Sequence, residues 1–219
     1  MSRISEARTL LREHANLLRT NALLPLVACV LLMGVAGCQK NIRLEVPSGL
    51  AADEAQRLVK AVELAAEADR ERDPERAAEK YRQAVTTYRE LHSAWNNLGV
   101  LLMNQEKYLQ AAEAFNTAAQ LSSSDARPLY NLALLWDRRG YIREARQFYA
   151  QAINRDPSFL PALRGGVRAD SLLQEGSTET LEWLQRALMQ EQDPRWQRWL
   201  RLQKARIETL PSVKYQSEL

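Results

Sequence analysis

The chain has 219 residues, with 30 Lys and Arg, 27 Asp and Glu, and a formal net charge of +3. Residues 1–37 hold four of the arginines and two of the glutamates, so the remainder has 26 basic and 25 acidic residues and a net charge of +1. This balance excludes the basic footprint of a nucleic-acid-binding domain, and we expect no nucleic-acid partner. The remaining length is enough for one continuous core, so we predict a single folded domain.

The first segment, residues 1–37, has the parts of a secretory signal. Four arginines precede an uncharged run over 22–37, which ends in Val-Ala-Gly directly before Cys38. The run is interrupted by Pro25 and is shorter than the roughly 20 residues that a membrane-spanning helix needs. An uncleaved membrane anchor remains the alternative, because the leader is long and two glutamates dilute its positive charge.

The small residues before Cys38 resemble the lipobox of bacterial lipoproteins. The resemblance implies cleavage before Cys38, a diacylglyceryl group on its sulfur, and acylation of its new amine by a fatty acid such as palmitate. Two or three acyl chains hold a protein at a membrane, since each buried methylene contributes about 0.8 kcal/mol. Gln39 stands where an Asp would retain a proteobacterial lipoprotein at the inner membrane, so we expect an outer-membrane lipoprotein facing the periplasm. In a Gram-positive cell the same signal implies a plasma-membrane anchor.

Residues 38–52 are predicted to be a tether, since Pro47-Ser48-Gly49 breaks any helical periodicity there. Beyond the tether, small, leucine and aromatic residues recur at a fixed spacing of 34. The columns are Leu64, Leu98 and Leu132; Ala65, Gly99 and Ala133; Ala77, Ala111 and Ala145; Tyr81, Phe115 and Tyr149; and Ala84, Ala118 and Ala152. Such a period predicts an array of helical hairpins that presents a surface.

These columns resemble the tetratricopeptide repeat family. The matching units are 58–91, 92–125, 126–159 and a divergent copy over 160–193. The first unit has Ala61 where the family has Trp and Arg72 where it has the turn Gly. The resemblance implies an all-α fold, a right-handed α-solenoid of about 3.5 to 4 helix-turn-helix repeats, within a domain over 53–210.

Close packing explains the residue types in the columns. Two helices approach closely only where side chains are small, so we expect Gly99 to face Ala111, and the aromatic column to fill the gap to the next hairpin. The large residues expected in this core, rather than around a cofactor, are Trp95, Phe115, Trp136 and Tyr149.

Capping residues and glycines mark the ends of the helices. The start signals are Asp73-Pro74, Ser93, Asp125, Ser177 and Asp193-Pro194, and the stop signals are Gly140 and Gly176. The predicted helices are 50–72, 74–90, 93–105, 108–121, 126–139, 142–154, 158–174 and 178–191. A last helix over 194–209, rich in Trp and Arg, is predicted to cap the solenoid before a tail over 211–219, with a partner or nucleic acid as its alternative role.

In tetratricopeptide arrays, the first helix of each pair lines a concave groove. At the family's groove positions this chain has Asn96, Asn97, Val100, Met103, Asn104, Arg127, Tyr130, Asn131, Leu134, Asp137 and Arg138. Asn side chains can bond to a ligand backbone, and Met103, Tyr130 and Leu134 offer apolar pockets. The resemblance therefore implies a protein or peptide ligand, and the alternative is the ordinary surface of a spacer.

One subtype of the family clamps the C-terminal carboxylates of its partner with two Asn, two Lys and one Arg. This chain keeps Asn97 and has Arg127 in place of one Lys. The other three positions hold Val62, Ala66 and Asn131. The clamp is incomplete, so we do not expect a heat-shock-chaperone tail as the ligand.

The sequence offers little for catalysis. His92 is the only histidine beyond the signal, which excludes a His-pair metal motif and leaves one poor candidate for a Ser-His-Asp arrangement. Gly165-Gly166 lacks the spacing of a phosphate-binding loop and is expected to permit a close helix approach. We predict no enzyme, no cofactor and no metal site, with a hydrolase as the remote alternative.

These observations predict a non-enzymatic, lipid-anchored adaptor that holds a protein partner at a membrane. Lipoproteins of this design resemble pilotins and pilus-assembly factors of type IV and Tad-type systems. They also resemble adaptors that dock peptidoglycan enzymes or β-barrel assembly factors. The rival interpretation is a structural spacer or an oligomerisation element, and the sequence leaves the oligomeric state open.

Overall fold

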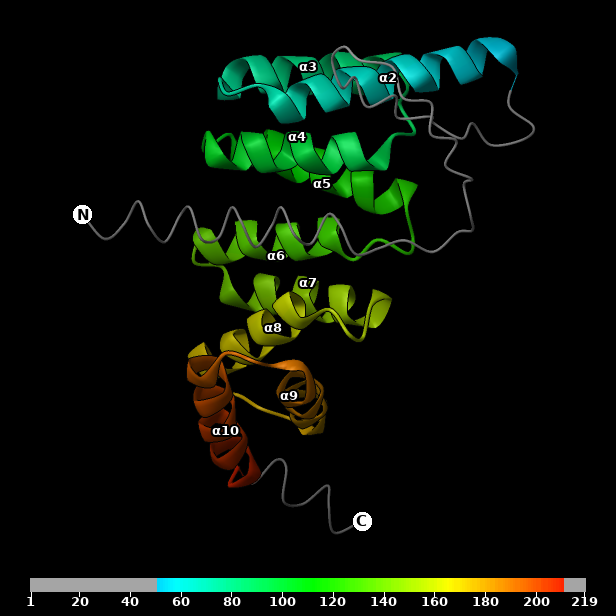
Figure 1. Cartoon of the computed structure of the whole chain (residues 1–219). Coiled ribbons are helices and arrows are strands. Elements are labelled where there is room, and N and C mark those ends of the chain that lie inside the picture. Colours follow the sequence, from blue (N-terminus) through cyan, green and yellow to red (C-terminus); the bar gives the residue numbers. More distant parts are fainter. Residues whose placement is uncertain (1–50, 211–219) are drawn as a thin grey trace, which may run out of the picture. The chain divides into compact units, whose positions relative to one another are not determined.

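Nine helices and no strand occupy residues 51–210, the part of the chain that this computed structural model describes (Figure 1). They are α2 (Ala52–Arg70), α3 (Pro74–Thr87), α4 (His92–Asn104), α5 (Tyr108–Leu121), α6 (Arg127–Arg138), α7 (Ile142–Arg155), α8 (Leu160–Leu172), α9 (Thr178–Gln190) and α10 (Pro194–Glu208). The all-α prediction is confirmed for these residues, and each predicted helix end lies within three residues of the observed one.

The predicted signal peptide over 1–37, Cys38, residues 38–50 of the predicted tether and the tail over 211–219 lie outside the described residues. At the other end of the tether, Ala52 is already the first residue of α2. The described part falls within one compact unit of the chain, Leu44–Leu219. None of its helices combines the length and the apolar character that crossing a membrane requires.

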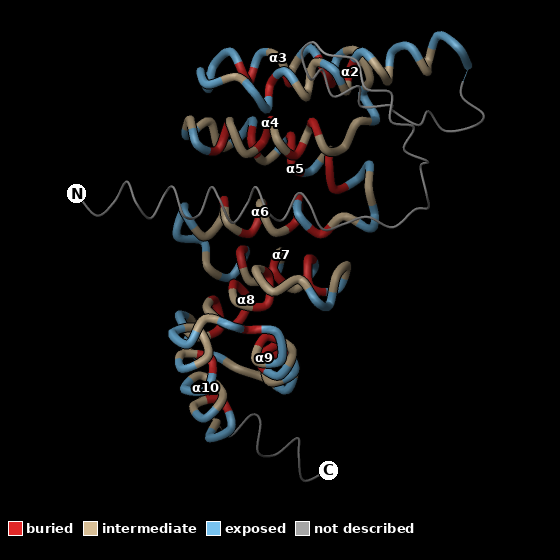
Figure 2. Tube along the Cα trace, in the orientation of Figure 1, coloured by how far each residue is buried: buried red, intermediate tan, exposed pale blue. Residues whose placement is uncertain are grey.

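Consecutive helices pack as stacked hairpins. The pairs are α2 with α3, α4 with α5, α6 with α7 and α8 with α9, and the second helix of each pair packs on the first helix of the next (Figure 1). Helix α10 packs on α9 and buries Leu200 and Ile207, as expected of a cap. Every helix from α2 to α10 contributes buried residues to the core (Figure 2).

The small and aromatic columns form the seam of each hairpin. Phe115 and Tyr149 are fully buried as predicted, whereas Trp95 and Trp136 are only half-buried. The nearest side chain to Gly99 is the ring of Phe115. A Cβ atom there would lie 2.6 Å from that ring. Helix packing at this position therefore leaves no room for a methyl group.

The glycine pair of α8 has the role expected of it. A Cβ atom on Gly165 would lie 2.3 Å from the ring of Tyr149, and one on Gly166 would lie 2.8 Å from the ring of Trp183. Helix α8 therefore approaches both α7 and α9 through its backbone.

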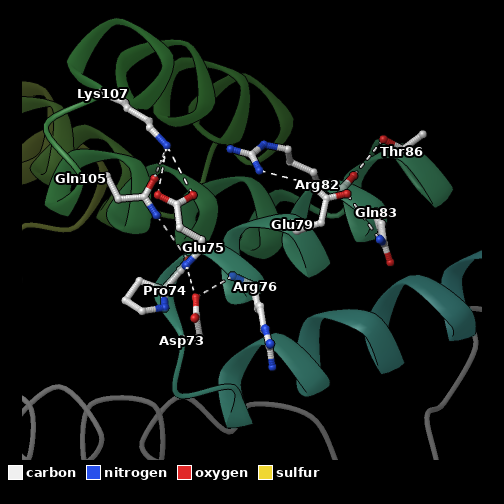
Figure 3. A network of polar contacts seen from close by, with 10 residues as sticks. All are labelled: Asp73, Pro74, Glu75, Arg76, Glu79, Arg82, Gln83, Thr86, Gln105 and Lys107. Carbon is white, nitrogen blue, oxygen red and sulfur yellow. Dashed lines mark hydrogen bonds and ion pairs between the residues drawn. The ribbon is translucent and has the colours of Figure 1, made fainter.

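Three of the five predicted capping residues cap their helices. Asp73 accepts hydrogen bonds from the backbone N–H groups of Glu75 and Arg76 at 2.9 and 3.1 Å (Figure 3). Asp193 accepts from a backbone N–H of α10, and Ser177 forms a capping box with Thr180. These bonds satisfy N–H groups that a helix cannot pair internally.

The other two start signals do not coincide with the observed N-caps, and they are displaced by two residues at Ser93 and by one at Asp125. Helix α4 begins at His92, because the Leu91 carbonyl already accepts from the backbone of Ala94, so Ser93 lies inside the helix. The N-cap of α6 is Ala126, and Asp125 instead accepts from the Arg127 N–H at 3.0 Å.

Polar contacts tie the turn after α4 to the start of α3. Lys107 Nζ lies 3.3 Å from Glu75 Oε1 and donates to Gln105 Oε1 at 2.9 Å, while Gln105 Nε2 donates to the Pro74 carbonyl at 3.3 Å (Figure 3). These side chains are largely solvated, so their ion pair contributes at most about 1 kcal/mol. These contacts join neighbouring hairpins at a defined position, and their contribution to stability is small.

The turn between the two helices of a hairpin contains a left-handed residue in three of the four repeats. Glu106 (φ 60°), Gly140 (φ 81°) and Gln174 (φ 56°) lie 34 residues apart. Gly140 ends its helix as predicted, but the prediction for Gly176 was wrong. Helix α8 ends before Gln174, and Gly176 instead lies where a Cβ atom would come 2.8 Å from Ile207 of α10.

We predict that Gln174→Gly and Glu106→Gly each raise the free energy of unfolding by about 0.5–1 kcal/mol. A side chain in the left-handed region is strained, and this relief outweighs the extra freedom of glycine in the unfolded chain. Urea denaturation measures the change. Gly140→Ala is the matched control and should lower the free energy of unfolding. A loss of stability in both glycine variants would contradict the strain argument.

Candidate partner-binding face

The predicted groove residues lie on α4 and α6, the first helices of the two central hairpins, which contact each other. Their exposure differs widely. Asn104, Arg127 and Arg138 are exposed; Asn97, Val100, Tyr130, Asn131, Leu134 and Asp137 are half-buried; Asn96 and Met103 are buried. We call these residues, with Arg164 and Arg168 at the equivalent positions of α8, the first-helix face.

Met103 does not offer the apolar pocket that was expected. Its side chain is 4% exposed and belongs to the hydrophobic core. It lies four residues after Gly99, so it shares the side of α4 that packs on the hairpin partner. Val100 and Leu134 pack against the core but keep some exposed surface, and they provide the apolar part of the face.

A chain of hydrogen bonds links the first three hairpins along this face. Asn131 Nδ2 donates to Asn96 Oδ1 at 2.8 Å, and Asn96 Nδ2 donates to Asn97 Oδ1 at 3.3 Å. Asn97 Nδ2 donates to the Tyr81 hydroxyl at 3.0 Å, and that hydroxyl donates to Asp69. Burial and the neighbouring carboxylate raise the pKa of Tyr81, so its proton stays in place. The side-chain amides of Asn96 and Asn97 are therefore used in hydrogen bonds within the protein, whereas the sequence predicted that they would bond to a ligand backbone.

Tyr130 lies beside an aromatic cluster. Its ring meets the ring of Phe159 edge-on at 5.3 Å and that of Tyr149 at 6.0 Å. These contacts fix the ring, yet the Tyr130 hydroxyl has no hydrogen-bond partner among residues 51–210 and its residue keeps exposed surface. The hydroxyl is therefore an oriented and available polar group.

Positive charge gathers around this hydroxyl. Burial raises the pKa of Tyr130, while the charges of Arg164, Arg168 and Arg138 act to lower it. Arg168 pairs with Asp137, and Arg164 Nε donates to the buried Glu191 at 2.6 Å. The only polar contact of Arg138 within the described range is with Asn104 Oδ1, at 3.5 Å. Arg138 is thus a cation without a carboxylate partner in this part of the chain.

His92 lies beside Asp125, its candidate partner in a Ser-His-Asp arrangement. His92 Nδ1 lies 3.6 Å from Asp125 Oδ2, and no serine hydroxyl bonds to His92 among the residues that the structure describes. Burial acts to raise the pKa of Asp125, but His92 and Arg127 outweigh it and hold that pKa well below its usual range. Within 51–210 there is also no group of three His, Cys, Asp or Glu residues placed to hold a metal ion.

Residues 62–126 and 97–158 match the family model of the tetratricopeptide repeat. A tetratricopeptide repeat protein from Parabacteroides merdae is similar in structure, with a TM-score of 0.55 and 20% identity over 70% of this chain and 59% of that one. The first such domain of Spaghetti (RPAP3), solved with an HSP90 peptide, gives a TM-score of 0.50 and 15% identity over 53% of this chain and 95% of that one. At these identities the likeness concerns the fold alone.

A relative by sequence is the BBSome complex member BBS4 of Xenopus tropicalis. The two proteins are 35% identical over 78 residues, which is 36% of this chain. The chain spans only 15% of the length of that protein, so the similarity covers a short run of repeats.

We predict that Asn96 and Asn131 are energetically coupled. A double-mutant cycle with Asn96→Ala and Asn131→Ala should give an interaction of about 0.5–1.5 kcal/mol in the free energy of unfolding, because their bond is short and shielded from water. The matched cycle with Asn104→Ala and Arg138→Ala should give a value near zero, since that contact is long and exposed. Equal couplings in the two cycles would contradict a role for the asparagine chain in holding hairpins together.

Proposed function

With tetratricopeptide repeats over residues 62–158 as the premise, we propose that the chain is a non-enzymatic adaptor that binds a segment of a protein partner on its first-helix face. The observation that carries the proposal is the presence of Tyr130 and Arg138 on the first-helix face. In the described part the half-buried Tyr130 has no hydrogen-bond partner for its hydroxyl, and the exposed Arg138 has only a long contact with Asn104; both lie on the same face as the apolar residues Val100 and Leu134.

The side chains of this face indicate which chemical groups a ligand would need. Arg138 suits a carboxylate, the Tyr130 hydroxyl suits a backbone or side-chain acceptor, and Leu134 suits an apolar side chain. We therefore propose a peptide segment that combines an acidic residue with an apolar one. The peptide-bound structure of the Spaghetti domain supports a fold of this kind as a peptide receptor.

The chaperone-tail clamp remains an unsuitable model for this ligand. Its two retained positions are engaged internally, since Asn97 bonds to Tyr81 and Arg127 pairs with Asp125 at 2.8 Å. Freeing either residue for a ligand would leave a buried or half-buried polar group unpaired, which costs about 1–3 kcal/mol.

We predict that Tyr130→Phe combined with Arg138→Gln weakens partner binding about tenfold, because each change removes one polar contact and keeps the shape of the residue. The measurement is a cross-linked pull-down of the full chain from membranes, with partner recovery quantified by mass spectrometry. The matched control is Tyr141→Phe with Arg139→Gln. It makes the same changes at exposed residues next to α6 but away from this face, where Arg139 lies over the Tyr108 ring.

The spacer alternative makes the opposite prediction. If the native chain, the Tyr130 and Arg138 variant and the control recover every partner equally, the face is ordinary surface and the adaptor proposal fails.

We further propose that Cys38 carries the lipid that anchors the adaptor, at the outer membrane facing the periplasm or, in another host, at the plasma membrane. The support is the lipobox-like sequence before Cys38 and the Gln after it. Such an anchor would place the first-helix face at an envelope surface, where pilus, secretion or envelope assembly takes place.

The lipid anchor predicts a defined mass for the native protein. Intact-mass spectrometry of material purified from membranes should show the loss of residues 1–37 and the addition of a diacylglyceryl group with one further acyl chain. Cys38→Ser should abolish both changes and leave the leader uncleaved. A native protein with an intact leader and a free thiol at Cys38 would instead favour the uncleaved anchor.

A further inference from the structure

Only one side of helix α10 packs against the rest of the array. Leu200 and Ile207 are fully buried, and the Trp196 ring is covered by the Arg164 guanidinium at 4.9 Å. Gln197 Nε2 donates to the Glu191 carbonyl at 2.6 Å and adds a polar attachment to the preceding loop. The inner side of the helix is therefore occupied by its capping role.

The opposite side is exposed and basic. Because a helix turns 100° per residue, its exposed stripe is Arg195, Arg198, Leu202 and Ala205, with Arg201 beside it. Leu202 is 62% exposed, and the Arg195 side chain is 92% exposed and pairs with Asp193 at 3.1 Å. Across the described range, 51–210, neither Arg198 nor Arg201 forms an ion pair. We call this stripe, with Arg201, the outer face of α10.

Charge is distributed unevenly between this helix and the rest of the array. Helix α10 has five Lys and Arg against one Glu, whereas residues 51–193 have 18 Lys and Arg against 22 Asp and Glu. The net charge is therefore +4 on α10 and −4 on the remainder. Net repulsion of the remainder therefore favours an approach to an anionic surface through α10, the most basic helix of the described residues.

We infer that the outer face of α10 docks on an anionic phospholipid surface. Arginines around an exposed Leu and Ala suit the interface of a bilayer, where the cations meet phosphate headgroups and the apolar side chains enter the region just below. The chain then contacts the membrane directly with its repeat array, in an orientation set by α10. This contact does not depend on acylation of Cys38 or on a ligand at the first-helix face.

A nucleic acid is the less suitable anion for this face. Single-stranded nucleic acids are held by aromatic side chains on which bases stack. The two tryptophans of α10 instead pack on each other edge-to-face, with ring centroids 5.5 Å apart, and Trp196 also stacks with Arg164. The exposed centre of the stripe is aliphatic, as lipid contact requires.

The test places a fluorescent reporter on the outer face. The full chain with Cys29→Ser, Cys38→Ser and Leu202→Cys carries one environment-sensitive NBD label, and a second protein carries the label through Met189→Cys, an 84% exposed site on α9. Each protein is mixed with phosphatidylcholine vesicles, either pure or with about one third phosphatidylglycerol. Because the label reports only its own position, insertion of the leader in either vesicle cannot mimic docking.

We expect the label at 202 to shift to the blue and brighten with the anionic vesicles only, and the label at 189 to remain unchanged. The response should disappear at high salt, and also with Arg198→Glu and Arg201→Glu. The variant with Arg72→Glu and Arg89→Glu, which makes the same charge change at other exposed sites, should keep it. Circular dichroism verifies that each variant remains folded.

Three results would overturn the inference. They are no response to anionic vesicles, an equal response of the two labels, or a response that survives both Arg→Glu changes on α10. A response to single-stranded RNA without a response to vesicles would assign the face to nucleic acid instead. The variant with Tyr130→Phe and Arg138→Gln should keep the vesicle response, so failure of the adaptor proposal and failure of this inference are separable.

Discussion

The stacked hairpins depend on ring-to-backbone contact between neighbouring helices. At Gly99 and Gly165 an aromatic ring lies 2.6 and 2.3 Å from where the first carbon of a side chain would be, so neither position has room for one. Such contacts fix the separation of the helices far more tightly than flexible side chains would.

The first-helix face combines support and recognition in neighbouring residues. Asn96 bonds across to α6 and is buried, while Arg138 on the same face is exposed and has no carboxylate partner in the described range. A family pattern marks both positions equally, but their surroundings give them different tasks. A ligand therefore meets a surface whose polar groups are already partly held in place, which lowers the entropy lost on binding.

The periodic columns made the fold predictable from sequence. A spacing of 34 identified the hairpins, and Asp73 and Asp193 located the starts of two helices. The site was harder to predict. The burial of Met103 depends on how α4 is rotated against α5, its hairpin partner. The ion pair of Arg164 with Glu191 joins residues that are far apart in the chain. The helix end predicted at Gly176 was wrong, because this glycine is needed for a tight contact with Ile207 of α10 rather than for ending α8. Cys38 lies outside the described residues, so its role still rests on sequence.

Most contact between helices is between neighbours along the chain, with α4 and α6 as an added pair. A protein built this way has no central core that resists deformation as a whole, and each interface yields a little on its own. Small rotations at successive seams would add along the stack, so a modest change at each interface would give a larger change in the distance between the two ends.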